Sequence, residues 1–331
     1  MKSHAVTMPP ISIFMNIVLV AIITTTLLLG VNSLDNSFTV EHQGEFISPS
    51  DILARMQLNM PVLAIALTAF ILMINSSLIT RISSSDMIYG VRSLTASPLQ
   101  VVVVGSLLTP TNSLYISLIS LLVTASIYYS CKDIGLGNRS KQMLHSGIFT
   151  GCVIALYPAS IVLAVIIPLI ILLLRRTGRE EIIITFAIIF PLFTYLYSYW
   201  LMGYPFTAPL VELYNENLRL FTNGVIEVDI NTVRYLIPII LALVLIPIGT
   251  LSLTNSKYHR SIQSILLLML LLIITSATVV VIGGEVIPFV AISATAISLL
   301  TNRALVEVNR GLSSVIYFVI ITMFILTRVL F

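Results

Sequence analysis

Charged residues are scarce in this chain of 331 residues: Asp, Glu, Lys and Arg together make up 9% of it, whereas 57% is hydrophobic. A soluble domain carries about 25% charged residues, and a globular protein must still cover itself with polar surface. Lipid is therefore the solvent for most of the chain. The net charge of +3 is small, and no nucleic-acid partner is expected.

Several motifs that mark enzymes and metal proteins are also absent. The only two cysteines, Cys131 and Cys152, fall at different depths of the expected membrane segments, which argues against a disulfide. There is no CxxC, HExxH or Walker-type glycine pattern, so the sequence identifies no metal ligands and leaves any cofactor unknown. Ion-driven transporters need a series of Asp, Glu or His residues within their membrane segments, and the apolar segments of this chain contain no such series.

What the chain does contain is long apolar runs without the alternation that marks transmembrane strands. About 20 apolar residues suffice for a helix to cross the hydrocarbon core. The candidate spans are 11–31, 58–80, 94–108, 113–130, 143–156, 159–174, 182–203, 233–253, 262–282, 286–301 and 313–330. The sequence thus predicts an all-α polytopic membrane protein with one integral membrane domain over residues 1–331. If either of the short hairpins at 94–130 and 143–174 is re-entrant instead of crossing, the number of spans falls by two, which gives nine to eleven spans.

The distribution of basic residues predicts the orientation. If the N-terminus is cytoplasmic, thirteen of the 17 basic residues fall on the cytoplasmic side and four outside. The outer four are Arg55, Arg219, Arg234 and Arg328. Because Lys and Arg in short loops stay cytoplasmic, this bias favours a cytoplasmic N-terminus and an outer C-terminus. We expect the first span to be retained, since no small-residue cleavage site follows it.

Two predicted outer segments, 32–57 and 204–232, are long enough to do more than connect helices. The stretch DNSFTVEHQGEFISPSD, residues 35–51, concentrates four carboxylates. Its end predicts a helix in which Ser48 is the cap and Pro49 occupies the first turn. In that helix Asp51 and Arg55, at i and i+4, share the aqueous face.

The second outer segment contains PLVELYNENLRLF, residues 209–221. Its apolar residues recur at helical spacing opposite two glutamates and Arg219, which predicts an amphipathic helix on the membrane surface. A simple interpretation of both segments is that outer loops are polar. A sharper one is a site at the outer surface, where carboxylates act as base or metal ligand and Arg55, Arg219 and Arg234 bind a lipid phosphate.

Polar residues within the spans are few. Asn75, Ser76 and Ser77 lie late in the second span, and we expect them to hydrogen-bond neighbouring helices rather than to form a site.

The stretch from about 92 to 176 has a recognisable order: a short helix that ends at a proline turn, a helix back to a basic loop, a glycine-spaced helix with Gly147 and Gly151 that ends at Tyr157-Pro158, and a helix that closes with an arginine cluster. This order resembles the central region of GT-C type membrane glycosyltransferases, the protein mannosyltransferase-like group. The whole chain, notably RRTGREEIIITFAIIFPLFTYLYSYWL, also resembles a family of uncharacterised multi-span inner-membrane proteins of Bacteroidota.

The GT-C resemblance implies a catalytic or metal-binding carboxylate in the first outer loop. That role falls to Asp35, with Glu45 and Asp51 as competitors. It also implies a polyprenyl-phosphate sugar as substrate, at the outer face of the bacterial inner membrane. Two alternatives stay open: a non-catalytic membrane subunit or scaffold of an envelope-assembly system, and a lipid or small-solute permease. Membrane lipids are expected partners, and protein partners are unknown.

Overall fold

The computed structural model of the chain describes residues 10–33, 49–84, 95–132, 140–173, 178–211, 214–215, 230–250, 260–282, 285–308 and 310–330. The elements in these ranges are α1 (Pro10–Ser33), α2 (Pro49–Asn59), α3 (Pro61–Ser83), α5 (Ala96–Leu107), α6 (Ser113–Cys131), α7 (Ser140–Leu156), η1 (Pro158–Val162), α8 (Leu163–Leu173), α9 (Gly178–Leu201), α11 (Ile230–Thr250), α12 (Arg260–Ile282), α13 (Val286–Glu307) and α14 (Arg310–Leu330). Each predicted span overlaps a helix in the described residues, and the span 159–174 corresponds to η1 followed by α8. The all-α prediction is confirmed.

Six helices in the described ranges are long and apolar enough to cross a membrane: α1, α3, α6, α9, α13 and α14. Shorter apolar helices occupy Ala96–Leu107, Pro158–Leu169, Leu236–Pro247 and Met269–Val281. The chain is therefore a multi-pass membrane protein by length and composition. The number of crossings and their orientation stay predictions.

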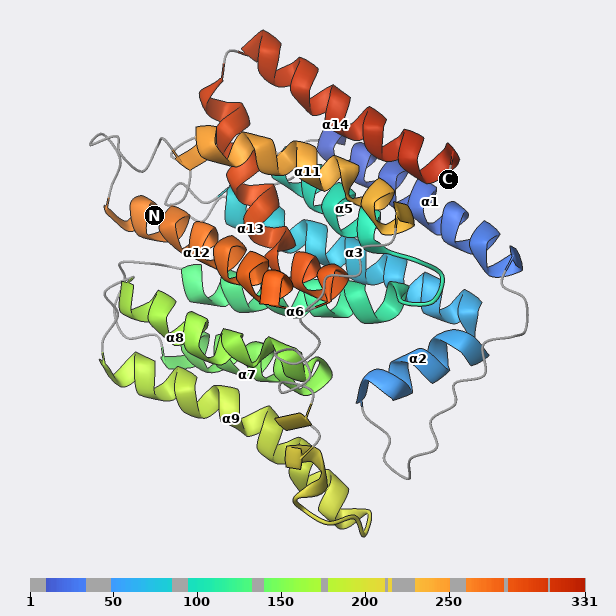
Figure 1. Cartoon of the computed structure of the whole chain (residues 1–331). Helices are drawn as coiled ribbons and strands as arrows, with labels where there is room; N and C mark the ends of the chain where they lie inside the picture. The colour runs from blue at the N-terminus through green and yellow to red at the C-terminus, as the bar shows by residue number, and fades with distance from the viewer. Residues whose placement is uncertain are drawn as a thin grey trace.

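The second span does not begin where the sequence suggested. The expected start at residue 58 lies inside α2, and α3 begins only at Pro61. Proline disfavours the helical conformation in the residue before it, and Met60 accordingly has φ −133° and ψ 61°. This break separates α2 from α3 and sets α2 off as a helix of its own (Figure 1).

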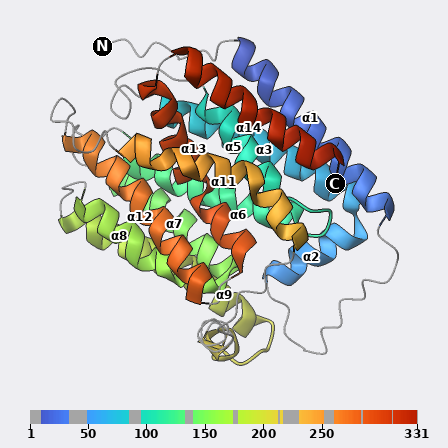
Figure 2. The ribbon, with the colours of Figure 1, turned by 45° about the horizontal axis from the view of Figure 1, so that its top comes forward.

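Helix α13 is the centre of the bundle. Its most apolar window is 89% buried, against 28% for α1 and α14 and 22% for α9. α13 packs against α5, α6, α11, α12 and α14, while α9 lies at the edge of the bundle and packs on α7 and α8. Figures 1 and 2 show α1 and α14 along one side and α8 and α9 along the other.

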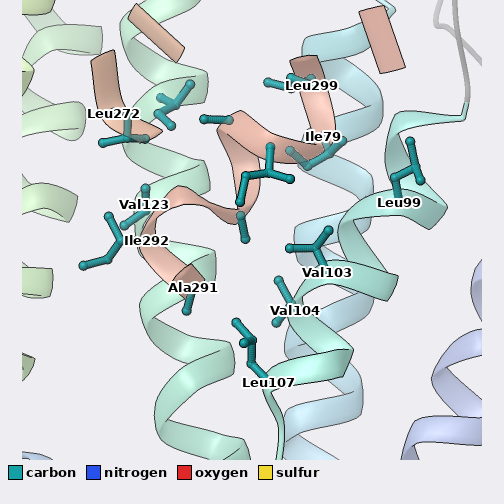
Figure 3. Packing of buried hydrophobic residues seen from close by; sticks show 14 of the residues in the cluster. Ile79, Leu99, Val103, Val104, Leu107, Val123, Leu272, Ala291, Ile292 and Leu299 are labelled. Carbon is teal, nitrogen blue, oxygen red and sulfur yellow. The ribbon is translucent and has the colours of Figure 1, made fainter. Parts of the chain in front are cut away.

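The core is built from aliphatic side chains between α5 and its neighbours (Figure 3). Each residue of α5 is buried, including the run Val101–Val104. Val103, Val104 and Leu107 of α5 lie near Ala291 of α13 in Figure 3. In lipid, helices associate through close packing and hydrogen bonds rather than through release of water. A fully enclosed α5 therefore depends on the fit of these side chains.

Candidate functional site at the Pro110 end of the bundle

Helix α2 begins at Pro49, as the sequence predicted. Asp51 lies in its first turn, where a carboxylate interacts favourably with the helix dipole. Asp51 is half-buried and Arg55, one turn later, is exposed. The predicted cap, Ser48, lies outside the described residues.

Gln57 holds α2 against the turn between α5 and α6. Its side chain is 2% exposed, and its amide nitrogen donates to the Pro110 carbonyl oxygen at 2.5 Å and to the Ser113 hydroxyl at 3.0 Å. Its carbonyl oxygen accepts from the Leu114 backbone N–H at 3.3 Å. Gln57 thereby satisfies backbone groups where one helix ends and the next begins.

The turn itself is ordered and closely packed. The Thr109 backbone N–H donates to the Asn112 side chain at 2.8 Å, and the Asn112 N–H donates back to the Thr109 carbonyl at 3.2 Å. Gly30 of α1 lies directly beside the turn, because a Cβ there would stand 2.6 Å from Pro110 Cγ. A larger side chain at this position would push α1 away.

Arg328, in the last turn of α14, reaches the same place. Its Nη2 donates to the Gly105 carbonyl oxygen at 2.5 Å and also to the Leu108 carbonyl oxygen. Gly105 is in the last turn of α5 and Leu108 directly follows the helix. The Gly105 carbonyl also accepts from the Leu108 backbone N–H at 3.3 Å, so Arg328 is its second donor. The positive guanidinium also interacts favourably with the negative, C-terminal end of the α5 helix dipole.

The Pro110 end, defined by the α5–α6 turn, thus gathers Gly30 of α1, Gln57 of α2 and Arg328 of α14. The basic-residue count assigned these same segments to one side of the membrane, the outer one. Their proximity agrees with helices that run in alternating directions across the membrane, as the basic-residue count assumes. Sequence reasoning noted Arg328 only as a charge, and it missed Gln57, which looked like one more polar residue of an amphipathic helix.

Of the predicted site residues, the structure places Asp51 and Arg55 together on α2. Asp35, Glu45 and Arg219 lie outside the described residues. Arg234 belongs to α11 by its backbone, and its side chain also lies outside the described part. Within the predicted helix 209–221, residues 209–211 and 214–215 are helical, and Leu210 and Tyr214 are exposed.

The interior holds a layer of uncharged polar side chains. The prediction for Asn75 and Ser76 is confirmed, since Asn75 donates to Ser120 of α6 at 3.0 Å and the Ser76 and Ser97 hydroxyls are 2.6 Å apart. Asn16 of α1, which the sequence analysis did not single out, donates to both Ser76 and Ser97 at 2.7 Å. The layer joins α1, α3, α5 and α6.

The same layer continues into α13. Gln100 of α5 donates to Ser120 at 3.2 Å and accepts from Ser298 at 2.8 Å. One turn away, the Thr124 and Thr295 hydroxyls lie 2.7 Å apart. Interhelical hydrogen bonds of this kind average about 0.6 kcal/mol in membrane proteins. Their role here is to set how the helices pair.

Two charged residues of the described part are buried, Arg303 of α13 and Glu180 of α9. Arg303 of α13 is 1% exposed, and its Nη2 lies 3.0 Å from Glu307 Oε1, one turn further on. The sequence had placed Arg303 in an inner loop beyond a span that ended at residue 301. That boundary is wrong, since α13 continues to Glu307. The carboxylate of Glu307 gives the buried guanidinium an ionic partner, without which burial would be very costly.

Among the described residues, no group of three or more His, Cys, Asp or Glu side chains is arranged to hold a metal ion. Cys131 and Cys152 form no disulfide with each other, as predicted. Comparison of the chain with protein-family models, with curated proteins and with solved structures finds no match in any of the three.

Proposed function

We propose that this chain is a GT-C-like membrane glycosyltransferase that acts at the Pro110 end of the bundle, on a polyprenyl-phosphate sugar at the outer face of a bacterial inner membrane. The observation that supports this most is the anchoring of α2 by Gln57. It fixes a helix with a carboxylate, Asp51, and a cation, Arg55, at the end of the bundle where α1 and α14 also end. The segment 34–48, which carries carboxylates, connects α1 to α2. Ser33, directly before it, belongs to α1, and Pro49, directly after it, belongs to α2.

In this proposal the acceptor hydroxyl oxygen bonds to the anomeric carbon of the sugar as the bond from that carbon to the phosphate oxygen breaks. A carboxylate takes the hydroxyl proton, either directly or while it organises a divalent ion. The candidates are Asp35, Glu45 and Asp51. The electron pair leaves with the polyprenyl phosphate, whose charge Arg55, Arg219 and Arg234 would neutralise.

Single amide substitutions test the proposal. Asp35→Asn, Glu45→Gln and Asp51→Asn are each assayed for sugar transfer from a membrane extract that contains polyprenyl-phosphate sugars. One of them should abolish transfer, because general-base catalysis contributes about 10²–10⁴-fold. Glu181→Gln, on α9 at the opposite end of the bundle, is the control and should retain activity. Full activity in all three variants would contradict the proposal.

A non-catalytic subunit of an envelope-assembly system is the second candidate. The exposed aromatic side chains along α9 favour it: Phe186, Phe190, Phe193, Tyr197 and Trp200 are 45–70% exposed. Such a face suits a partner helix as well as lipid. A subunit of this kind would tolerate each amide substitution, because loss of one surface charge costs at most about 1 kcal/mol. It would instead lose a copurifying protein when Phe186 and Phe190 are replaced by Ala.

A further inference from the structure

At the end of the bundle opposite Pro110, aromatic rings join the end of α6 to the start of α7. Tyr128 and Tyr129 are in the last turn of α6, with ring centroids 5.2 Å apart and planes at 73°. Tyr129 stacks on His145 of α7 at 5.1 Å and on Phe149 at 5.7 Å. Three rings from two helices therefore form one continuous stack.

Two lysines flank this stack. Lys132 follows α6, and its Nζ lies 5.7 Å from the centroid of the Tyr128 ring, within range of a cation–π interaction. Lys141 is in the first turn of α7, and its backbone carbonyl lies 2.6 Å from Nδ1 of His145. A carbonyl only accepts hydrogen bonds, so Nδ1 of His145 carries a proton and the ring orientation is fixed. Both lysine side chains are exposed.

This combination suits a membrane–water interface. α6 is long and apolar enough to cross a membrane, and the tyrosines occupy its last turn, the depth at which Tyr and Trp concentrate. Lys132 directly follows α6 and Lys141 is in the first turn of α7. A Lys just beyond an apolar span attracts an anionic lipid surface. The basic-residue count predicts that this end is cytoplasmic, the side on which anionic lipids face such segments.

We propose that Tyr128, Tyr129, Lys132, Lys141 and His145, the aromatic–lysine cluster, bind the phosphate headgroup of an anionic phospholipid. Lys132 and Lys141 contact the phosphate, and the ring stack packs against the glycerol and upper acyl carbons. The site is independent of the proposed transferase site, which lies at the other end of the bundle.

Neighbouring charges on α9 provide the controls. The contacts of Gly147 with Ile184 and of Gly151 with Ile188 set α7 and α9 side by side, with the first turn of α9 level with Lys141. That turn contains Arg179, which is exposed, and Glu181, which is half-buried. Neither residue takes part in the ring contacts or the cation–π interaction of the cluster, so replacing either one changes the local charge and leaves those contacts in place.

The test uses the purified full-length protein with an equimolar mixture of phosphatidylglycerol and phosphatidylcholine, and native mass spectrometry reads the ratio of the two bound lipids. The unmodified chain should prefer phosphatidylglycerol. Lys132→Gln and Lys141→Gln should each lower the ratio about fivefold, since one Lys near an anionic surface contributes about that factor. Arg179→Gln should lower the ratio clearly less than either lysine variant, because Arg179 lacks the ring contacts of the cluster, and Glu181→Gln should not lower it.

Two further arms examine the rings and the source of the phosphate. Tyr129→Leu keeps an apolar side chain but removes the stack on His145, and it should lower the ratio without any change in charge. Inorganic phosphate added at millimolar concentration should not displace the lipid. The proposal is overturned if the lysine variants keep the preference, if Arg179→Gln lowers it as much as they do, or if free phosphate competes.

Discussion

Gly151 of α7 lies against the backbone of α9, so close that a Cβ on this glycine would stand 2.3 Å from the Ile188 carbonyl oxygen. Four residues earlier, a Cβ on Gly147 would stand 2.4 Å from that of Ala187. Such spacing of glycines lets two helix backbones approach in a membrane. The two glycines noted in the sequence, Gly147 and Gly151, therefore form the closest described approach of α9 to α7, beside the packing of α9 on α8.

Gly151→Leu should loosen α9. The new side chain has no space, because carbonyl oxygen and proline atoms surround the site, and overpacking typically costs about 1–3 kcal/mol. The unfolding midpoint in mild detergent should fall clearly. Gly311→Leu is the matched control, since nothing lies within 4 Å of a Cβ at Gly311. Equal midpoints for the two variants would show that the close approach of α7 and α9 is absent.

Gln57→Leu should release α2 from the α5–α6 turn. The substitution removes the donors to Pro110 and Ser113 and the acceptor for Leu114, and one net hydrogen bond contributes about 0.5–1.5 kcal/mol. Hydrogen–deuterium exchange of the backbone amides in α2 should become faster by about tenfold or more. Asn59→Leu, at the exposed end of the same helix, should leave exchange unchanged. No difference between these variants would refute the anchor.

Arg328→Leu should destabilise the junction of α14 with α5. It removes the guanidinium from the carbonyls of Gly105 and Leu108. The Gly105 carbonyl keeps the Leu108 N–H, so the expected loss is that of hydrogen bonds to a charged donor, about 1.5–3 kcal/mol. Thermal unfolding in detergent measures the effect. Arg55→Leu removes an exposed arginine and should stay within about 0.5 kcal/mol of the unmodified chain. A result in which Arg55→Leu is the more damaging of the two would contradict this assignment.

Element type followed from the sequence because long apolar runs in lipid have few alternatives to helix. The start of α2 at Pro49 was equally legible from proline chemistry. Boundaries were harder to place where a partner decided them: Arg303 read as a loop residue because its burial depends on Glu307. For the same reason Gln57 and Asn16 escaped notice. A lone amide shows its role only when the helices that it bridges are known.

The candidate site was predictable only as a choice among carboxylates and arginines. The sequence grouped Asp51 and Arg55 on one helical face, and the structure keeps them on α2. The position of α2 against the α5–α6 turn rests on Gln57 and Pro110, two residues 53 positions apart. The residue pattern of a single segment does not show that Gln57 contacts Pro110.

We expect the Pro110 end and segment 35–51 to face the outside, and cysteine labelling measures this sidedness. In a chain with Cys131→Ala and Cys152→Ala, single cysteines are introduced as Asp51→Cys and Lys141→Cys and exposed to a membrane-impermeant maleimide in spheroplasts. Asp51→Cys should react in intact spheroplasts, and Lys141→Cys only after permeabilisation. The reverse pattern would place the carboxylates in the cytoplasm and contradict the proposed site.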